Sequence, residues 1–284
     1  MALARHGSGF AAALGAFASQ IHPVFMLPPL ASSLFGALLT GVESLPLAGL
    51  HATAVFAGVY TAHVKDGYVD FFVRGEDDDH PLTATGCRLA LAGSTVVFAV
   101  CVAGIALLVD LAAALVTAPG WAIGYFHAPQ LDTDPVTATA GYPFGIALAL
   151  LGGYYVQAGT LAPVAVAFAG TFLVVLSGIK VIDDAQDLAY DRSIGKRTVA
   201  VVLGRERARR AAFGLMTVGL IAVVAFATAG VFPPTAAAAP AVFGVVALTA
   251  RRADDRLATM LLIRGSYLFL AVLIAATWFR PWAA

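Results

Sequence analysis

Three aspartates near residue 190 are spaced so that their side chains could act together. Asp184, Asp187 and Asp191 stand three and four residues apart, which on a helix places them on one face. Carboxylates this close repel one another and raise each other's pKa unless a cation neutralises them. Ligand sets made only of oxygen suit Mg²⁺, which usually shares its coordination with water and substrate phosphates. The spacing therefore predicts half of a Mg²⁺–diphosphate site, with Arg192, Lys196 and Arg197 following it to meet phosphate oxygens.

A second group with similar spacing occurs much earlier in the chain. Asp66 and Asp70 repeat the spacing of the last two aspartates of the later group, and His63 stands where its first aspartate would be. Each copy ends an apolar run and is followed by basic residues and glycine. Internal repeats in membrane proteins tend to place the functional site at the repeat interface. We therefore expect the two acidic groups to face one cavity and hold a single pyrophosphate through bridging metal ions.

Composition separates this chain from soluble proteins. Of its 284 residues 60% are hydrophobic and only 12% are charged, and the mean hydropathy is +0.85. A soluble domain carries about 25% charged residues, so we expect a polytopic protein in a lipid bilayer. A formal net charge of zero gives no basis for nucleic acid binding. Cys87 and Cys101 fall in or beside an apolar segment, which predicts buried thiols and no disulfide. No pattern of cysteine and histidine predicts zinc.

Windows of about 20 apolar residues mark the expected membrane spans. Nine such spans lie near residues 21–39, 44–64, 87–109, 111–127, 136–157, 160–182, 208–230, 235–250 and 258–279. They predict an all-α bundle forming a single domain over residues 1–284, in which helices 1–4 (about 10–127) and helices 5–8 (about 136–250) are a pseudo-repeat, followed by helix 9. A short interfacial helix is expected before the first span, in preference to a cleavable signal peptide, because Arg5 is the single arginine or lysine ahead of it.

The distribution of lysine and arginine predicts the orientation of the spans. With the N-terminus in the cytoplasm, the connections after spans 2, 4, 6 and 8, together with Arg5, hold 15 of the 17 lysines and arginines. Arg264 falls inside the last span, and only Arg280 is left outside. Both aspartate groups fall in connections on the same side. We therefore expect an active site facing the cytoplasm, and the excess of arginine over lysine with acid-rich loops suits the plasma membrane of a prokaryote from high salt.

The second aspartate group resembles a motif of the UbiA superfamily of intramembrane prenyltransferases. That motif reads roughly Asp-x-x-Asp-x-x-x-Asp followed by Gly-x-x-Thr, and this chain fits it without a gap. The matching residues are Asp184, Asp187, Asp191, Gly195 and Thr198. The resemblance covers essentially the whole chain. It implies a nine-helix, all-α bundle with aspartate-rich motifs after helices 2 and 6.

The first motif of the family is matched less completely. It reads Asn-Asp-x-x-Asp-x-x-x-Asp, followed by an Arg-Pro-x-x-x-Gly-like stretch. Asp66 and Asp70 match its last two acids, and residues 80–86 resemble its tail, with histidine where arginine is common. Ala62 and His63 replace the asparagine and the first aspartate. These replacements leave open how many metal ions the first motif binds.

The resemblance implies an enzyme, a Mg²⁺-dependent prenyltransferase. It would transfer the polyprenyl group of an allylic polyprenyl diphosphate to a lipophilic acceptor, while Mg²⁺ and basic side chains absorb the charge of the leaving pyrophosphate. The expected metal ligands are Asp66, Asp70, Asp184, Asp187 and Asp191. The expected catalytic residues are Asp66, Asp70, Asp187, Asp191 and Tyr125, which matches the family's helix-4 tyrosine.

Each residue expected to bind the diphosphate also has a second interpretation. These residues are Lys180, Arg74, Arg192, Lys196, Tyr68 and Tyr190. Lys180 lies one helical turn before Asp184, so it could be an ion-pair partner, a diphosphate ligand, or both. The other basic residues could be ordinary charges flanking a span, and the tyrosines, Tyr125 included, could belong to an interfacial aromatic belt. The acidic run over residues 76–79 is expected to be a solvated face.

The acceptor and the class of protein each leave alternatives open. The stretch 152–159 is similar to one in quinone-pathway members, which favours an aromatic quinone precursor; a glycerophosphate ether lipid and a carotenoid-like acceptor are the alternatives. A cation transporter would place its carboxylates nearer the bilayer midplane. A CDP-alcohol phosphotransferase would need Asp-Gly-x-x-Ala-Arg, which Asp66-Gly67 begins and Asp70 breaks. No obligate protein partner is expected.

Overall fold

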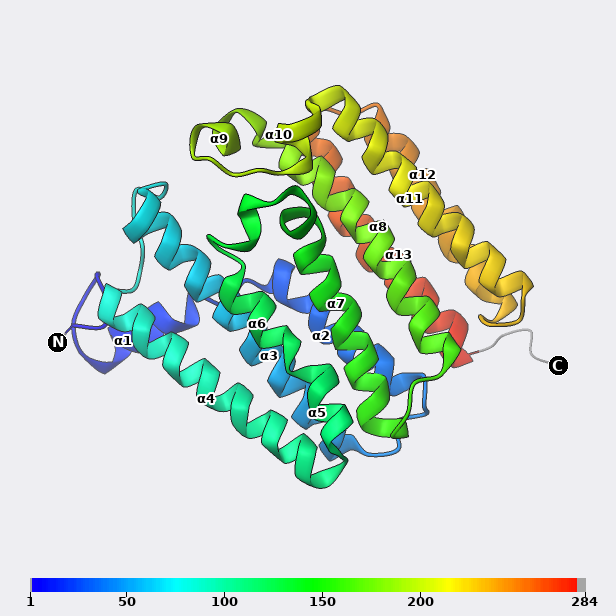
Figure 1. The fold of residues 1–284 in the computed structure, drawn as a ribbon, viewed down its shortest axis with the longest axis horizontal. Coiled ribbons are helices and arrows are strands. Elements are labelled where there is room, and N and C mark those ends of the chain that lie inside the picture. Colours follow the sequence, from blue (N-terminus) through cyan, green and yellow to red (C-terminus); the bar gives the residue numbers. More distant parts are fainter. Residues whose placement is uncertain (1, 280–284) are drawn as a thin grey trace. The chain divides into compact units, whose positions relative to one another are not determined.

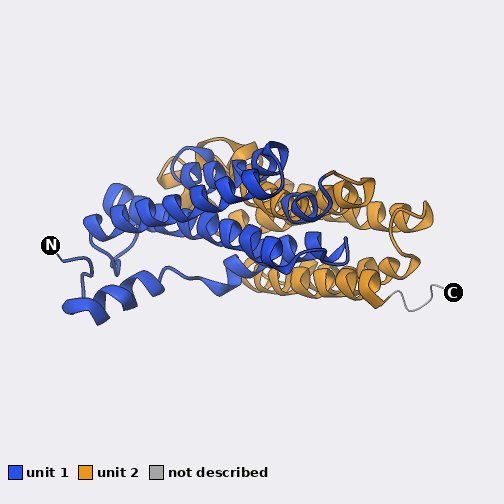
Figure 2. Ribbon diagram, turned by 90° about the horizontal axis from the view of Figure 1, so that it is seen from below, with its two compact units in different colours: residues 1–131, 152–159 blue, residues 132–151, 160–284 orange. Residues whose placement is uncertain are grey.

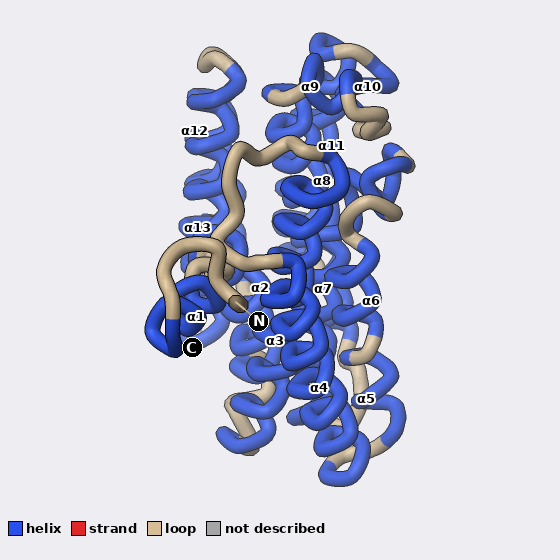
Figure 3. The backbone as a smooth tube through the Cα atoms, turned by 90° about the vertical axis from the view of Figure 1, so that its left-hand side faces the viewer, coloured by secondary structure: helices blue, strands red, loops and turns tan. Residues whose placement is uncertain are grey.

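The structure is a computed structural model that describes residues 2–279 (Figure 1). Over these residues the chain forms helices joined by loops, and no strand is present in this range (Figure 3). The predicted all-α fold is confirmed. Arg280, the one basic residue expected on the far side of the membrane, lies outside the described residues.

Seven helices are long and apolar enough to cross a membrane within the described range, or eight if α1 (Gly9–Ala18) and α2 (Pro23–Leu38) together make one span bent by 64°. Helix α1 corresponds to the short helix expected before the first span. The expected fourth span is two short helices, α5 (Leu111–Thr117) and α6 (Pro119–Phe126), separated at Ala118. The number nine and the cytoplasmic N-terminus stay predictions.

The chain divides into two compact units, coloured separately in Figure 2. Unit 1 comprises residues 1–131 and 152–159, and unit 2 comprises residues 132–151 and 160–284. Helix α7 (Pro135–Ala158) begins in unit 2 and ends in unit 1. The single domain and the pseudo-repeat stay predictions, and each unit is described by itself.

Unit 1 is built around α3 (Leu45–Tyr68), which packs against α2, α4 (Ala84–Leu108) and α6. The side chain of Ser44 accepts a hydrogen bond from the Leu47 amide and so caps the start of α3. Gly58 of α3 and Gly124 of α6 have no side chains to separate them, and a Cβ on Gly124 would collide with the carbonyl oxygen of Gly58. At its other end α3 continues into a π-helical turn, η1 (Val69–Arg74), which carries the second aspartate of the first motif.

Unit 2 is organised on α8 (Pro163–Gln186), which packs along α11 (Arg205–Thr228) and also contacts α13 (Asp255–Phe279). The remaining elements are η2 (Leu131–Thr133), which starts in unit 1, α9 (Leu188–Ser193), α10 (Val199–Leu203), η3 (Pro234–Ala237) and α12 (Ala238–Arg251). In the core of unit 2 the rings of Phe168 and Phe232 stack with their centroids 3.8 Å apart. The dense packing of α8 fixes the position of the second motif at its end.

Candidate active site

The second motif lies where α8 ends. The helix stops at Gln186, Asp187 has non-helical dihedral angles (φ −100°, ψ 15°), and α9 starts at Leu188. The single helix assumed over the three aspartates is therefore interrupted at Asp187, although the Asp191 amide still donates to the Asp187 carbonyl at 2.8 Å. Carboxylates at the C-terminal end of a helix oppose its dipole. This end of α8 is consequently a place that favours a bound cation.

Lys180 supplies part of the positive charge that the end of α8 favours. Its ammonium lies 2.6 Å from Oδ1 of Asp184 and 3.0 Å from Oδ2 of Asp183, so the ion-pair interpretation of Lys180 is confirmed. The Asp184 side chain is only 5% exposed, and its other oxygen, Oδ2, is buried without a hydrogen-bond partner among the described residues. A buried carboxylate oxygen left unpaired is costly. A metal ion fits this site because it would satisfy that oxygen, in addition to the charge that Lys180 provides.

The Gly-x-x-Thr part of the motif shapes the turn after α9. Gly195 adopts a positive φ of 77°, and the Lys196 amide donates to the Asp191 carbonyl at 2.9 Å. The Thr198 hydroxyl lies 3.5 Å from Oδ2 of Asp191 and accepts from the Val201 amide, which caps α10. Burial raises the pKa of the Asp191 carboxyl to about 6, against the effect of Lys196 and with that of Asp184. Glycine and threonine thus hold a buried carboxyl that is costly to ionise without a cation.

The first motif holds its second aspartate in a buried ionic group. Arg74 lies 3.5 Å from Oδ1 of Asp70 and 3.6 Å from Oε1 of Glu76, and all three side chains are largely buried. Gly75 ends the π-helical turn with a φ of 65°, which brings the Glu76 amide to 2.7 Å from the Asp70 carbonyl. The prediction that residues 76–79 form a solvated face is wrong for Glu76, whose side chain is 8% exposed because it pairs with Arg74. It holds for the three exposed aspartates that follow.

A cation missed by the sequence analysis lies beside the first motif. The Lys65 ammonium is 5.2 Å from the ring centroid of Tyr125 and 6.0 Å from that of Tyr68. Tyr125 in turn stacks on Trp121 with centroids 5.0 Å apart. These contacts place the predicted tyrosines next to the residue that precedes Asp66. The adjacency of Lys65 to that aspartate was the one signal in the sequence that could have identified it.

His63 behaves as a satisfied polar residue. Its Nδ1 lies 3.3 Å from the Gln20 carbonyl oxygen, and its ring meets the edge of His22 with centroids 4.9 Å apart. No group of three or more His, Cys, Asp or Glu side chains converges into a metal site within residues 2–279. Mg²⁺ commonly takes only one or two carboxylates and completes its shell with water and phosphate. The residues therefore suit Mg²⁺ held jointly with a diphosphate better than a metal held by protein alone.

The predicted site residues fall into two groups, one in each unit. Unit 1 contains Asp66, Tyr68, Asp70, Arg74 and Tyr125. Unit 2 contains Lys180, Asp184, Asp187, Tyr190, Asp191, Arg192 and Lys196. Within unit 2, Arg192 and Tyr190 are exposed on α9, whereas Asp184 and Asp191 are buried.

The stretch that suggested a quinone-type acceptor has a local packing role in unit 1. A Cβ on Gly153 would collide with the carbonyl oxygen of Ser33, and one on Gly152 would collide with the ring of His51. The side-chain amide of Gln157 both accepts from the Ser44 amide at 2.7 Å and donates to the Ser44 carbonyl at 2.9 Å. These contacts join the end of α7 to α2 and to the start of α3. They account for the stretch by packing alone.

A protein-family model matches most of this chain. The model of the UbiA prenyltransferase family matches residues 85–273 of this chain. That range contains the whole second motif and begins after Asp66 and Asp70 of the first. A comparison with curated proteins finds none that matches.

Solved structures with the same fold cover nearly the whole chain. A structure of digeranylgeranylglyceryl phosphate synthase is 13% identical, with a TM-score of 0.72 over 94% of this chain and 99% of that one. A UbiA homologue from Aeropyrum pernix K1 is 17% identical, with a TM-score of 0.71 over 90% and 98%. A UbiA homologue from Archaeoglobus fulgidus bound to GPP and Mg²⁺ is 15% identical, with a TM-score of 0.68 over 92% and 99%. At these identities the likeness shows the fold alone.

Proposed function

Because this chain belongs to the UbiA prenyltransferase family, as its motifs predicted, we propose that it transfers a polyprenyl group from an allylic polyprenyl diphosphate to a lipophilic acceptor in a Mg²⁺-dependent reaction. The observation that carries the proposal is the buried end of α8. There Asp184 keeps one carboxylate oxygen without a hydrogen-bond partner in the described chain. The UbiA homologue from Archaeoglobus fulgidus that was solved with GPP and Mg²⁺ supports the same choice of substrate and cofactor.

The proposed metal ligands are the five motif aspartates, Asp66, Asp70, Asp184, Asp187 and Asp191. Mg²⁺ held by them would supply positive charge to the leaving pyrophosphate. We propose the same metal-binding role for both groups on the strength of their repeated spacing. Asp184 and Asp191 are held by fixed local contacts, so they would need little rearrangement to bind the ion.

Basic and aromatic side chains would act on the substrate itself. Lys180 and Arg74 each already contact a motif aspartate, and they would bind the diphosphate oxygens as charge builds on them. The bond between the allylic carbon and the diphosphate oxygen breaks, and its electron pair leaves with the pyrophosphate. Tyr125 would present its π face to the allylic cation, as it already does to Lys65. The acceptor then forms the new bond and loses a proton, while the apolar helices exclude water.

Three classes of acceptor are candidates for the reaction. An aromatic quinone precursor remains the first candidate on sequence likeness, although the residues behind that likeness have packing roles. A glycerophosphate ether lipid is the main alternative, and a carotenoid-like acceptor is a third. We propose a site open to the cytoplasm in the plasma membrane of a prokaryote, on the distribution of arginine and lysine.

The test is an assay of the purified protein in lipid. Radiolabelled geranylgeranyl diphosphate and Mg²⁺ are supplied with a panel of quinone-precursor, glycerophosphate and carotenoid acceptors. Asp66→Asn and Asp187→Asn remove a negative charge at constant size and should lower prenyl transfer by about 100-fold or more. Asp134→Asn is the matched control, since Asp134 only caps α7 and asparagine caps equally well. Transfer without Mg²⁺, or undiminished in both motif variants, would refute the proposal; cation flux across empty liposomes would favour a transporter.

A further inference from the structure

Five arginines outside the motifs gather at one end of unit 2. They stand at the start of α11, at the end of α12 and at the start of α13. We call them the arginine patch, and they are Arg207, Arg210, Arg251, Arg252 and Arg256. All five are exposed. The three helices are candidate membrane spans, so the patch lies where membrane-spanning segments end.

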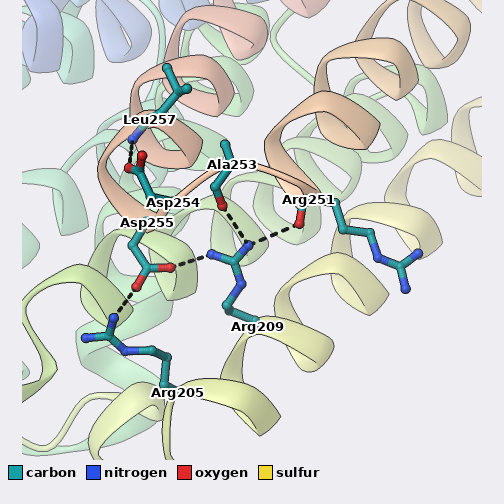
Figure 4. Close-up of polar contacts among 7 residues, drawn as sticks. All are labelled: Arg205, Arg209, Arg251, Ala253, Asp254, Asp255 and Leu257. Atoms are coloured by element: carbon teal, nitrogen blue, oxygen red, sulfur yellow. Dashed lines mark hydrogen bonds and ion pairs between the residues drawn. The ribbon is translucent and has the colours of Figure 1, made fainter.

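A partly buried ionic cluster fixes the three helix ends to one another (Figure 4). The Asp255 carboxylate binds both Arg205, at 2.6 Å, and Arg209. The second guanidinium nitrogen of Arg209 lies 3.4 Å from the carbonyl oxygens of Arg251 and Ala253. Arg209 therefore joins α11 to the α12–α13 connection and to the start of α13 at once. The backbone that carries the patch is thus held in place by contacts that do not use the patch side chains.

The acids near the patch leave its charge largely uncompensated. Asp255 is engaged by the two inner arginines, and Asp254 accepts a hydrogen bond from the Leu257 amide as the cap of α13. Within the described residues the side chains of Arg207, Arg252 and Arg256 form no ion pair. Figure 4 shows the Arg251 side chain directed away from the cluster. The only other acid in these helix ends is the exposed Glu206. A cluster of exposed guanidinium groups remains free to bind an anion.

The surface next to the patch is apolar. Val245 and Leu248 of α12 and Leu257 and Met260 of α13 are between 40% and 66% exposed. Cationic side chains above an apolar band are typical of the boundary between lipid tails and headgroups. Guanidinium groups bind phosphate oxygens in pairs, and clusters of basic residues beside a membrane span attract anionic lipids.

We propose that the arginine patch binds the headgroups of anionic phospholipids. An excess of basic residues on one side of a membrane follows from the orientation rule alone. This rule does not require the patch to stand on a fixed backbone, nor its side chains to lack acidic partners. Both features favour a surface that selects phosphate groups in the bilayer. The proposal is independent of the proposed prenyl transfer, because it uses none of the motif residues.

Binding of fluorescent phosphatidylglycerol and phosphatidylcholine to the purified protein in neutral detergent tests the proposal. We expect tighter binding of phosphatidylglycerol at low salt, with a preference that weakens as salt is raised. Changing all five patch arginines to glutamine should remove most of this preference. Each arginine lost should lower the affinity for phosphatidylglycerol by up to about fivefold. Changing all five to lysine preserves the charge and should retain the preference. Thermal unfolding of both variants and the wild type shows whether they are equally folded.

Three results would overturn the inference. The wild type could bind both lipids equally, or the glutamine variant could keep the preference of the wild type. A soluble polyglutamate could also displace phosphatidylglycerol and bind more tightly than the lipid, which would assign the patch to an acidic protein. Prenyl transfer in phosphatidylcholine liposomes, measured in parallel, should continue in the glutamine variant. Because prenyl transfer and lipid binding are measured separately, failure of the proposed enzymatic function can be distinguished from failure of lipid binding.

Discussion

Replacing Gly178 by alanine tests whether the packing of α8 on α11 supports the second motif. A Cβ at Gly178 would lie 2.6 Å from the Ala212 carbonyl oxygen, 2.8 Å from Cγ of Met216 and 3.2 Å from its amide nitrogen. The Met216 side chain can move, but the carbonyl oxygen belongs to the backbone of α11. The two helices must therefore separate or shift for the alanine to fit.

The cost follows from two opposing effects. Overpacking a close-packed interior costs about 1–3 kcal/mol, whereas glycine to alanine within a helix gains up to about 1 kcal/mol. Gly170 on the same helix supplies the control, since nothing lies within 4 Å of a Cβ there and the position is exposed. Gly170→Ala should be neutral or slightly stabilising. Gly178→Ala should be less stable than Gly170→Ala by about 1–3 kcal/mol, since the helix gain is common to both.

Thermal unfolding in detergent, followed by differential scanning fluorimetry, measures the difference. A loss of 1 kcal/mol corresponds to roughly 2–4 °C in Tm for a chain of this size. Because Gly178 lies less than two helical turns before Asp184, Gly178→Ala should also weaken Mg²⁺-dependent turnover, whereas Gly170→Ala should not. A Gly178→Ala protein as stable and active as Gly170→Ala would show that the α8–α11 contact does not have this tight geometry.

Three further perturbations have expected outcomes. Lys180→Met leaves the buried Asp184 carboxylate without its cation and should destabilise the metal-free protein by about 3 kcal/mol; added Mg²⁺ should restore part of the Tm, and no change in Tm would contradict the ion pair. Asp255→Asn removes the negative charge shared by Arg205 and Arg209 and leaves one acceptor oxygen in place of two, which should cost about 2 kcal/mol, measured as Tm; an unchanged Tm would contradict the cluster. The hydrogen bond from His6 lowers the pKa of Asp79 below its ordinary 3.8, so its stabilising contact should persist above pH 3.8 and weaken as the pH falls through the lowered value. The Arg5 amide donates a hydrogen bond to Pro81, and its protection from hydrogen exchange should show this weakening. Asp79→Asn should remove this pH dependence. The same pH profile in both proteins would contradict the prediction.

The sequence was sufficient for the fold class, which depends on apolar windows along the chain, and for the family, which depends on the second motif. Apolar windows and the scarcity of charge predict membrane helices wherever they are packed. The second motif is specific because its residues have defined local roles. Gly195 adopts a positive φ, and Thr198 both caps α10 and contacts Asp191. Local requirements of this kind are visible in a sequence.

Features that depend on tertiary packing were not predictable in the same way. The break at Asp187 follows no proline or glycine, and helical periodicity continues through it. Glu76 looked like one of four equivalent acids until its pairing with the buried Arg74 separated it from the others. Lys65 was not singled out, because nothing in the sequence places it over the ring of Tyr125. Each of these depends on a partner distant along the chain or on a backbone turn that leaves no pattern.

The π-helical turn at Val69–Arg74 has a consequence for comparing this chain with its relatives. Such a turn accommodates one residue more than an α-helical turn would, and π-bulges recur at functional sites. An α-helix advances about 100° per residue, so deleting one residue here would rotate Arg74 and Glu76 by about that angle relative to Asp66. A homologue with the same residue types but one residue fewer would present its arginine in another direction. Pairwise alignments that place a gap elsewhere in this region would therefore equate side chains that do not occupy equivalent positions.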